Sequence, residues 1–442
     1  MRAFRRALLC LGIGLALADS SIVTLALPSI LGRFDVGITT VSWVLTSFNL
    51  ALVLAAVPAA YVARRRPNEV FALGSLIFAA SSLACGLAPA FAVLVTARCV
   101  QAVGAALVVV SALELLRTTV ENGARATRTW VAAGVVGAAI GPAAGGVLTA
   151  AFGWESIFLV QVPVALALLA AARREPARTS VASAGRPRVF ANLGLLLLSG
   201  GLVAALFLLV LLLVTGWRMS PAAAGLVVSV LPLAALASGR VVPSSVGVAI
   251  RVATGVVLVG GGLGALALLP RAGWEWTLAP QVLLGAGVGL ALAALTERAL
   301  GGRGDPVVHA GWTLAARHAG VVLGLLLLAP VLTHALERNK ETAIRTGAAE
   351  VLDSRIPPLD KLALTRDVLD EVDAAKKQGK LPDVGHVVAE RGTSDDYRSL
   401  ASALENELDR AVTDAFSRPF ALAALLALAT LLPLALARWE RA

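Results

Sequence analysis

The chain has 442 residues, of which 58% are hydrophobic and 15% charged, and its mean hydropathy is +0.82. This composition excludes a soluble domain of this length and predicts repeated membrane-spanning helices of about 20 residues, with the lipid bilayer as their main partner. The net charge of +10 does not indicate nucleic acid, because most arginines lie in short loops between apolar runs.

The N-terminus combines a basic start, a short apolar run and a small-residue step from Ala16 to Ala18. This pattern is also typical of a cleavable signal peptide. The apolar run resumes after Asp19 and continues to Leu31, however, and many more spans follow. We therefore interpret the segment as an uncleaved first transmembrane helix.

Twelve apolar runs of membrane-spanning length divide into two sets of six. The first set comprises residues 7–31, 40–63, 69–90, 91–116, 129–151 and 156–172. The second set comprises residues 189–214, 221–243, 251–270, 277–299, 307–334 and 419–438. A polar linker with five arginines separates them at residues 173–188. We predict an all-α integral membrane protein with two six-helix bundles, formed by residues 1–172 and by residues 189–336 with 419–442.

Arginine counts predict the orientation in the membrane. Arginines gather before the first span, in alternate loops, in the central linker and after the last span. The intervening short loops hold only Arg33, Arg218 and Arg271. Because arginine-rich loops stay in the cytoplasm, we expect both termini and the linker to be cytoplasmic in a multi-pass protein of the inner (cytoplasmic) membrane.

Residues 337–418, between the eleventh and twelfth spans, differ from the rest of the chain. They hold every lysine, and their 13 basic and 17 acidic residues give a net charge of −4. Residues 359–377 and 396–416 have apolar positions at helical spacing. We expect a helical extracytoplasmic insert. It is either a small cap that extends the eleventh and twelfth spans or a domain that docks a partner or handles substrate.

The fifth span contains the uncharged stretch GVVGAAIGPAAGG at residues 134–146, which ends in Gly146. Four of its glycines recur at three- and four-residue steps: Gly134, Gly137, Gly141 and Gly145. They predict a flat helical face that another helix can approach backbone to backbone. Neighbouring helices can satisfy the groups that Pro142 frees. The stretch is either a bent helix at a moving interface or a tight, static contact.

Ionisable side chains at membrane depth are costly, so each is a candidate for function. Asp19 lies near the middle of the first span. Arg98 in the fourth span is its expected partner, with Gln101 on the same helical face. A buried carboxylate beside a cation suits a proton-coupling site, although a purely structural pair is the alternative.

Other polar residues lie inside the spans. Glu114 is three residues from Arg117, so the two are expected to pair at the water boundary or to act in transport. Arg317 and His318 lie about ten residues into the eleventh span, and His318 is either a packed, hydrogen-bonded residue or a proton relay. The expected lining of a substrate cavity is Asn49, Gln101, Gln161, Gln281, Arg317 and His318.

No enzyme motif is present in the sequence. It lacks a nucleotide-binding G-x-x-x-x-G-K-[ST], a G-x-S-x-G and a zinc-binding spacing. Its three cysteines fall inside apolar runs without a C-x-x-C spacing, so neither a disulfide nor a metal site is indicated. We expect no catalytic residue, no cofactor and no metal, and a process driven by a gradient of protons or of the substrate itself.

Several stretches resemble the major facilitator superfamily, in particular its drug:proton antiporter branches. GVVGAAIGPAAGG resembles the antiporter signature of the fifth helix. ADSSIVTLALP, residues 18–28, resembles the first-helix motif, whose embedded acid falls on Asp19. ARCVQAVGAAL, residues 97–107, resembles the fourth-helix motif, whose Arg and Gln fall on Arg98 and Gln101. The resemblance covers nearly all of the membrane part and implies two bundles with alternating access.

Two features depart from the family pattern. The loop after the second span usually carries a Gly and an Asp before its basic cluster, and Ala60 and Arg64 stand at those places. If a conformational latch is present at this loop, it therefore uses other residues than the usual Asp. The candidates are Arg64, Glu114 and Arg117. The branch also often has fourteen spans, whereas twelve are counted here.

These features predict a proton-coupled secondary active transporter that exports amphipathic or lipophilic small molecules, as in multidrug efflux. A monomer is expected, because one chain supplies both bundles. One alternative is an exporter of lipids or lipoconjugates in which residues 337–418 dock cargo or an extracytoplasmic partner. Another is a non-transporting membrane sensor whose insert binds a ligand. An importer of small polar solutes is disfavoured, because the spans offer few polar groups.

Overall fold

The computed structural model describes residues 2–120, 122–172, 185–241, 246–300, 305–377, 382–392 and 394–436. Every regular element in these ranges is helical, and eleven helical stretches there are long and apolar enough to cross a membrane. A further stretch, Ser156–Ala171, lies where the sixth span is expected but is shorter. The predicted all-α membrane fold is therefore confirmed for the described part of the chain.

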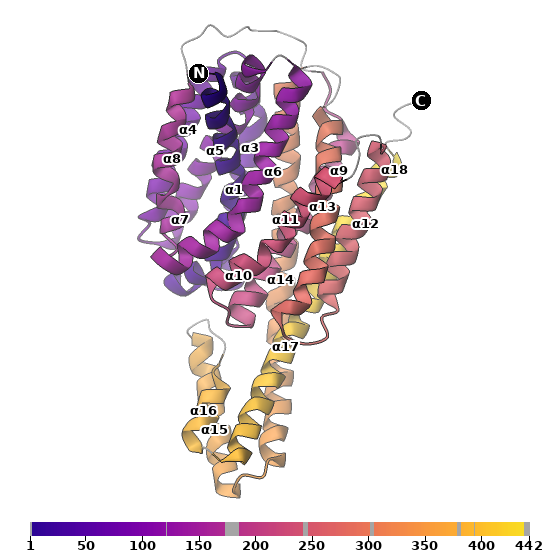
Figure 1. Cartoon of the computed structure of the whole chain (residues 1–442). Helices are drawn as coiled ribbons and strands as arrows, with labels where there is room; N and C mark the ends of the chain where they lie inside the picture. Colours follow the sequence, from indigo (N-terminus) through magenta and orange to yellow (C-terminus); the bar gives the residue numbers. More distant parts are fainter. Residues whose placement is uncertain are drawn as a thin grey trace.

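The first half of the chain forms one bundle of long helices (Figure 1). Its elements are α1 (Arg2–Phe34), α2 (Ile38–Val41), α3 (Trp43–Ala63), α4 (Pro67–Gly86), α5 (Phe91–Thr119), α6 (Gly123–Phe152), α7 (Ser156–Leu159), α8 (Gln161–Ala167) and η1 (Leu168–Ala171). The predicted linker lies mostly outside the described residues, and its last four residues precede the second half without helical structure.

The second half repeats the arrangement and adds the insert. Its elements are α9 (Val189–Val210), η2 (Leu211–Gly216), α10 (Pro221–Val228), α11 (Val230–Val241), α12 (Val248–Ala267), η3 (Trp274–Thr277), α13 (Leu278–Leu300), α14 (Pro306–Asp353), α15 (Pro358–Lys377), α16 (Val384–Arg391), α17 (Asp395–Leu428) and α18 (Leu431–Leu436).

Prolines and capping side chains set where helices begin. The Ser220 side chain accepts a hydrogen bond from the backbone N–H of Ala223, and the Asp305 carboxylate accepts one from that of Val307. A proline follows each capping residue at the first helical position, where its missing N–H costs nothing. Pro67 opens α4 in the same way. Each of these helices therefore begins at a defined residue, and the chain can reverse its direction over a short loop.

Four of the predicted spans, the second, sixth, eighth and twelfth, are interrupted, and the seventh changes its helical type. The second span breaks into α2 and α3 at Ser42, and the eighth breaks into α10 and α11 at Ser229. The Ser229 hydroxyl donates to the carbonyl of Gly225 at 2.6 Å, a contact that bends helices. The end of α9 winds into the π-helical η2. The sequence predicted continuous spans here, because local apolar patterning does not report such breaks.

Glycine contacts recur in equivalent places of the two halves. A Cβ added to Gly104 of α5 would lie 2.9 Å from the carbonyl oxygen of Gly74 of α4. One added to Gly255 of α12 would lie 2.6 Å from the carbonyl oxygen of Gly287 of α13. These close approaches need glycine on both helices. The recurrence supports two copies of one six-helix arrangement.

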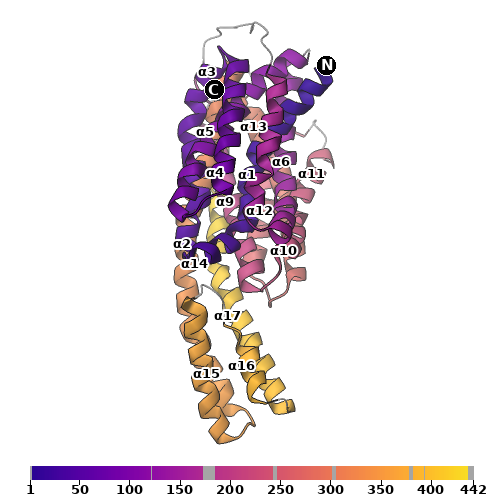
Figure 2. The ribbon, with the colours of Figure 1, turned by 90° about the vertical axis from the view of Figure 1, so that its left-hand side faces the viewer.

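The insert grows directly out of the membrane helices (Figures 1 and 2). The 48-residue α14 and the 34-residue α17 run on without a break and carry α15 and α16 beside them. A small apolar core holds the four helices together: Val351, Ile356, Leu364, Val384, Val388, Tyr397, Leu400 and Leu404. In the structure α14 and α17 continue the predicted eleventh and twelfth spans into the insert, and α16 is a helix that the sequence did not predict.

The two halves touch near both ends of the membrane part. Toward the end that holds the N-terminus, a Cβ on Gly311 of α14 would lie 2.9 Å from the carbonyl oxygen of Ala56 of α3. Toward the insert, the hydroxyls of Thr39 (α2) and Thr333 (α14) lie 3.1 Å apart. The halves are therefore in contact on both sides of the buried polar residues.

Candidate functional site

Asp19 and Arg98 form an ion pair deep inside the first half. Asp19 lies midway along α1, Arg98 lies two turns into α5, and both side chains are fully buried. Arg98 Nη1 donates to Asp19 Oδ2, and Arg98 Nε donates to the carbonyl of Val44 on α3 at 3.2 Å. The structure thus brings together the two residues expected to pair, inside the bundle and away from lipid. A buried pair is tolerated only when its remaining groups are also hydrogen-bonded.

Two glutamines supply those hydrogen bonds. Gln161 Nε2 donates to Asp19 Oδ1 at 3.1 Å, and Arg98 Nη1 donates to Gln101 Oε1 at 2.6 Å. Gln101 Nε2 in turn donates to Ser82 Oγ at 2.8 Å. The network therefore joins α1, α4, α5 and α8. Gln101 and Gln161 were expected to line a cavity, but the structure places them around the ion pair.

Aromatic rings enclose the Arg98 guanidinium. Its carbon lies 4.1 Å from the ring centroid of Phe48 and 5.6 Å from that of Phe158. Such cation–π contacts strengthen where water is excluded. One guanidinium nitrogen, Nη2, is buried without a hydrogen-bond partner among the described residues. The cation thus keeps an unused donor next to its carboxylate partner.

A hydrogen bond links the two halves at mid-depth. His318 Nδ1 of α14 lies 2.5 Å from Asn49 Oδ1 of α3, and both side chains are buried. Since the amide oxygen can only accept, Nδ1 carries the proton. Because α3 also supplies the Val44 carbonyl to Arg98, this single helix contacts both the ion pair and the second half.

Arg317 lies beside His318 and stands apart from the Asp19 network. Its side chain is partly exposed, and it makes no ion pair or hydrogen bond with any residue that the structure describes. His318 Nε2 is also buried without a partner in that part of the chain. These two polar groups on α14 therefore lack a hydrogen-bond partner in the part of the chain that the structure describes.

The remaining predicted residues lie elsewhere. Gln281 is buried near the start of α13 and donates to a threonine hydroxyl at 3.0 Å. Glu114 and Arg117 pair at 3.1 Å close to the end of α5. Arg64 ends α3 and lies 5.2 Å from a tyrosine ring. The structure therefore does not bring these four residues into the central network.

The glycine face of the fifth span serves two different contacts. Gly134, Gly137, Gly141 and Gly145 all pack against α1 within the first half. Gly146 instead meets Pro221 and Gly225 of α10 in the second half, and a Cβ on Gly225 would lie 2.8 Å from the carbonyl oxygen of Pro142. Four of the five glycines thus make a tight contact inside one half, whereas Pro142 and Gly146 lie at the interface between the halves.

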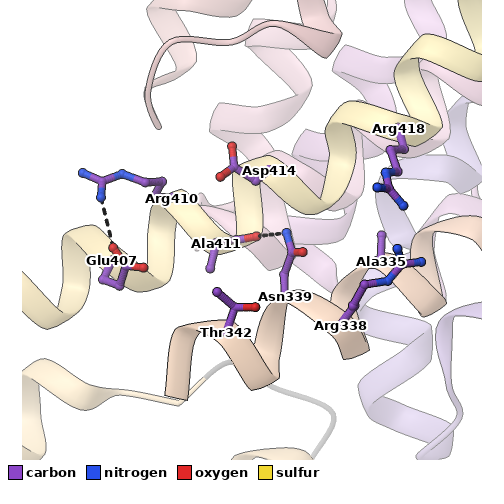
Figure 3. Close-up of a pocket in the computed structure, with 9 residues that line it drawn as sticks. All are labelled: Ala335, Arg338, Asn339, Thr342, Glu407, Arg410, Ala411, Asp414 and Arg418. Carbon is purple, nitrogen blue, oxygen red and sulfur yellow. Dashed lines mark hydrogen bonds and ion pairs between the residues drawn. The ribbon is translucent and has the colours of Figure 1, made fainter. Parts of the chain in front are cut away.

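A charged groove of about 210 Å³ lies at the base of the insert, between α14 and α17 (Figure 3). Arg338 of α14 and Arg418 of α17 extend toward the same space. Neither makes an ion pair with a described residue, whereas Arg410 pairs with Glu407 at 3.0 Å. The groove lies where the predicted eleventh span ends and the predicted twelfth span begins.

Contacts between α17 and the loop before α10 hold the root of the insert. Trp217 Nε1 donates to Thr413 Oγ1 at 3.1 Å, and Arg218 lies 3.9 Å from Asp409. Burial raises the pKa of Asp409, Arg218 partly offsets this effect, and the charge of Glu405 adds to it. The Arg218–Asp409 pair is partly exposed and therefore contributes little, and the indole–hydroxyl hydrogen bond is the shorter of the two contacts.

Sequence reasoning missed several residues that shape the site. Ser82, Phe48 and Phe158 all lie within apolar runs, where a single serine or phenylalanine carries no distinguishing signal. Across the described residues, no three histidine, cysteine or acidic side chains cluster closely enough to hold a metal ion. The central network of the first half is thus built from one ion pair and the hydrogen bonds around it.

Two bundles of apolar helices, the first with a buried charge pair inside it, form an architecture typical of membrane transporters. A model of the Major Facilitator Superfamily matches residues 9–325, more than two thirds of the chain. The chain therefore belongs to this superfamily of transporters and is a multi-pass membrane protein.

Known relatives are similar to parts of the chain. The multidrug resistance protein Stp of Mycobacterium tuberculosis is 39% identical over 166 residues, which cover 36% of this chain and 30% of Stp. The tetracenomycin C resistance and export protein of Streptomyces glaucescens is 32% identical over 267 residues, 57% of this chain and 49% of that protein. The chain thus matches less than half the length of these relatives.

The fold is similar to a solved structure over nearly its full length. A bacterial homolog of the human lysosomal transporter Spinster, in an inward-facing and unoccupied conformation, superposes with a TM-score of 0.66 at 18% identity. The match covers 98% of this chain and 97% of that chain. At this identity, the likeness supports the fold alone.

Proposed function

We propose that this protein is a proton-coupled secondary active transporter that exports amphipathic or lipophilic small molecules. The observation that carries the proposal is the buried Asp19–Arg98 pair, held at mid-depth by the hydrogen bonds of Gln161 and Gln101. The resemblance of three motifs to drug:proton antiporters and the names of the efflux relatives support it. The proposed location is the cytoplasmic membrane with both termini inside.

In the proposed cycle, the proton acts on the ion pair. Protonation of Asp19 removes the charge that neutralises Arg98, which leaves an arginine uncompensated in a low-dielectric interior. Arg98 then gains by moving toward water or toward another anion. Because Arg98 is hydrogen-bonded to the Val44 carbonyl of α3, a movement of Arg98 would also move α3. Asn49 of α3 in turn contacts His318 of the other half. Proton binding and the relative position of the halves are coupled in this way.

Asp19→Asn tests the proposal. We expect the variant to lose proton-gradient-driven accumulation in proteoliposomes and to retain substrate counterflow, because the neutral amide cannot exchange a proton. The substrate is chosen by thermal stabilisation of the purified protein with a panel of amphiphiles at one acidic and one alkaline pH.

Glu69→Gln serves as the control, because Glu69 is an exposed carboxylate that pairs with Arg66 at 3.2 Å. It should leave gradient-driven accumulation unchanged. Gradient-driven transport at the wild-type rate in the Asp19→Asn variant would remove Asp19 from the coupling mechanism. Loss of both activities in a folded variant would favour a purely structural ion pair.

The second candidate function is export of lipids with anionic head groups. The observation that favours it is the groove at the base of the insert, next to the ends of the predicted spans, where Arg338 and Arg418 have no ion-pair partner among the described residues. Two arginines that face one space suit a phosphate group. The insert would then receive the head group as the lipid leaves the membrane.

A double variant, Arg338→Gln with Arg418→Gln, separates the two functions. Lipid export predicts that transfer of labelled phosphatidylglycerol between vesicles is lost while transport of simpler amphiphiles persists. Arg345→Gln with Arg366→Gln is the control, since it removes two exposed insert charges away from the groove. If neither pair of substitutions changes lipid transfer, or no transfer occurs with the wild type, the second candidate fails.

A further inference from the structure

Arg317 is an unneutralised charge near the middle of the membrane part. It lies eleven residues after the first residue of α14, Pro306, which is roughly 16 Å along the helix axis at 1.5 Å per residue. The hydrocarbon core of a bilayer is about 30 Å thick. Because arginine stays protonated in proteins, its positive charge is a constant feature of the interior.

The helix geometry directs Arg317 toward the inside of the protein. Trp312, five residues earlier, is 40% exposed, so its side of α14 is not covered by other helices. Five residues rotate a helix by roughly 140°, which puts Arg317 on the opposite side. The next residue, His318, contacts Asn49 of the first half, and Gly320 packs on α9. Arg317 therefore lies between these two contacts, where the halves meet.

No carboxylate in the described spans balances this charge. Asp19, at similar depth, is already paired with Arg98. Glu114 and Glu297 lie within about two turns of helix ends, and each has its own arginine partner. An unpaired cation in a low-dielectric interior is costly, and such residues mark substrate or ion pathways. The interior thus carries an excess positive charge that an incoming anion would neutralise.

We propose that Arg317 binds the acidic head group of the substrate, so that the transported molecules are amphiphiles carrying a carboxylate, sulfonate or phosphate. This inference rests on the proposed transport function and narrows its substrate class. The planar guanidinium offers paired donors to such a group. The buried Nε2 of neighbouring His318 has no partner among the described residues and would supply a second polar contact.

Binding of three matched probes tests the proposal: dodecanoate, dodecanamide and dodecylammonium. Thermal stabilisation of the purified full-length protein gives their apparent Kd values. The wild type should bind dodecanoate at least tenfold more tightly than the other two. Arg317→Gln should abolish this preference, whereas Arg317→Lys, which keeps the charge, should retain part of it. Arg345→Gln, an exposed change on the same helix, should behave as the wild type.

The outcomes separate this inference from the transport function. Equal binding of all three probes by the wild type, or unchanged dodecanoate binding in Arg317→Gln, overturns the assignment of Arg317. If counterflow of the amide or ammonium probe is nevertheless observed, the transport function stands without the anionic substrate class. If no probe is bound or transported, both proposals fail. If the Arg317→Gln variant does not fold, the probe preference of the wild type and that of the Arg317→Lys variant still test the assignment of Arg317.

Discussion

At the residue scale, the packing of single glycines sets how closely helices can approach. Gly137 of α6 touches the backbone of Gly14 of α1, so a side chain there would force the two helices apart. Gly261 of α12, by contrast, faces open space, and no neighbouring atom would lie within 4 Å of a Cβ added there. The same residue type thus has opposite roles at the two positions.

Gly137→Ala should therefore lower stability, and Gly261→Ala should not. Overpacking of a tight contact costs roughly 1–3 kcal/mol, whereas alanine in an open helical position gains up to about 1 kcal/mol over glycine. The midpoint of thermal unfolding of the purified variants measures both effects. A Gly137→Ala protein as stable as the wild type would show that α1 and α6 are not held at this distance.

The central residues could be predicted in part from the sequence. The charge of Asp19 inside an apolar run required a partner, and Arg98 with Gln101 on the same helical face supplied one. The rings of Phe48 and Phe158 and the hydroxyl of Ser82 could not be singled out, because many similar residues occur in apolar runs. Their roles depend on which helices become neighbours, which a single sequence does not specify.

At the element scale, α14 makes three different sets of contacts along one continuous helix. Its first part contacts α3 through Gly311 and His318, its middle packs on α9 through Gly320, and its last part forms a wall of the insert. A displacement of the membrane part of α14 would therefore move the insert as well. The apolar core of the insert makes this coupling rigid, because α15, α16 and α17 pack on the end of α14.

The helices themselves were largely predictable, and their irregularities were not. Apolar runs of membrane-spanning length predicted the spans. Apolar positions at helical spacing, with charged residues between them, predicted α15 and the outer part of α17. The breaks at Ser42 and Ser229 and the π-helical end of α9 were missed. Such features arise when side chains compete for backbone carbonyls or when neighbouring helices impose a bend. They are tertiary effects, and hydrophobic periodicity does not report them.

At the scale of the whole molecule, the two halves use equivalent helices to contact each other. The α6–α10 contact at Gly146 and Gly225 lies toward the insert, and the α3–α14 contact at Gly311 lies toward the N-terminus. Alternating access requires that contacts at one end open while those at the other end hold. The residues at each end should therefore separate at some point of the cycle, if the protein works as proposed.

Cross-linking Thr39 to Thr333 tests this movement. Their hydroxyls lie 3.1 Å apart toward the insert, so cysteines at these positions are within reach of a disulfide. In a variant whose native cysteines are replaced by alanine, oxidation of Thr39→Cys with Thr333→Cys should abolish substrate counterflow, and a reductant should restore it. Each single cysteine variant should be unaffected by the oxidant. Counterflow at the full rate in the cross-linked protein would mean that the halves stay together at this end, because a covalent bond between α2 and α14 permits no opening there.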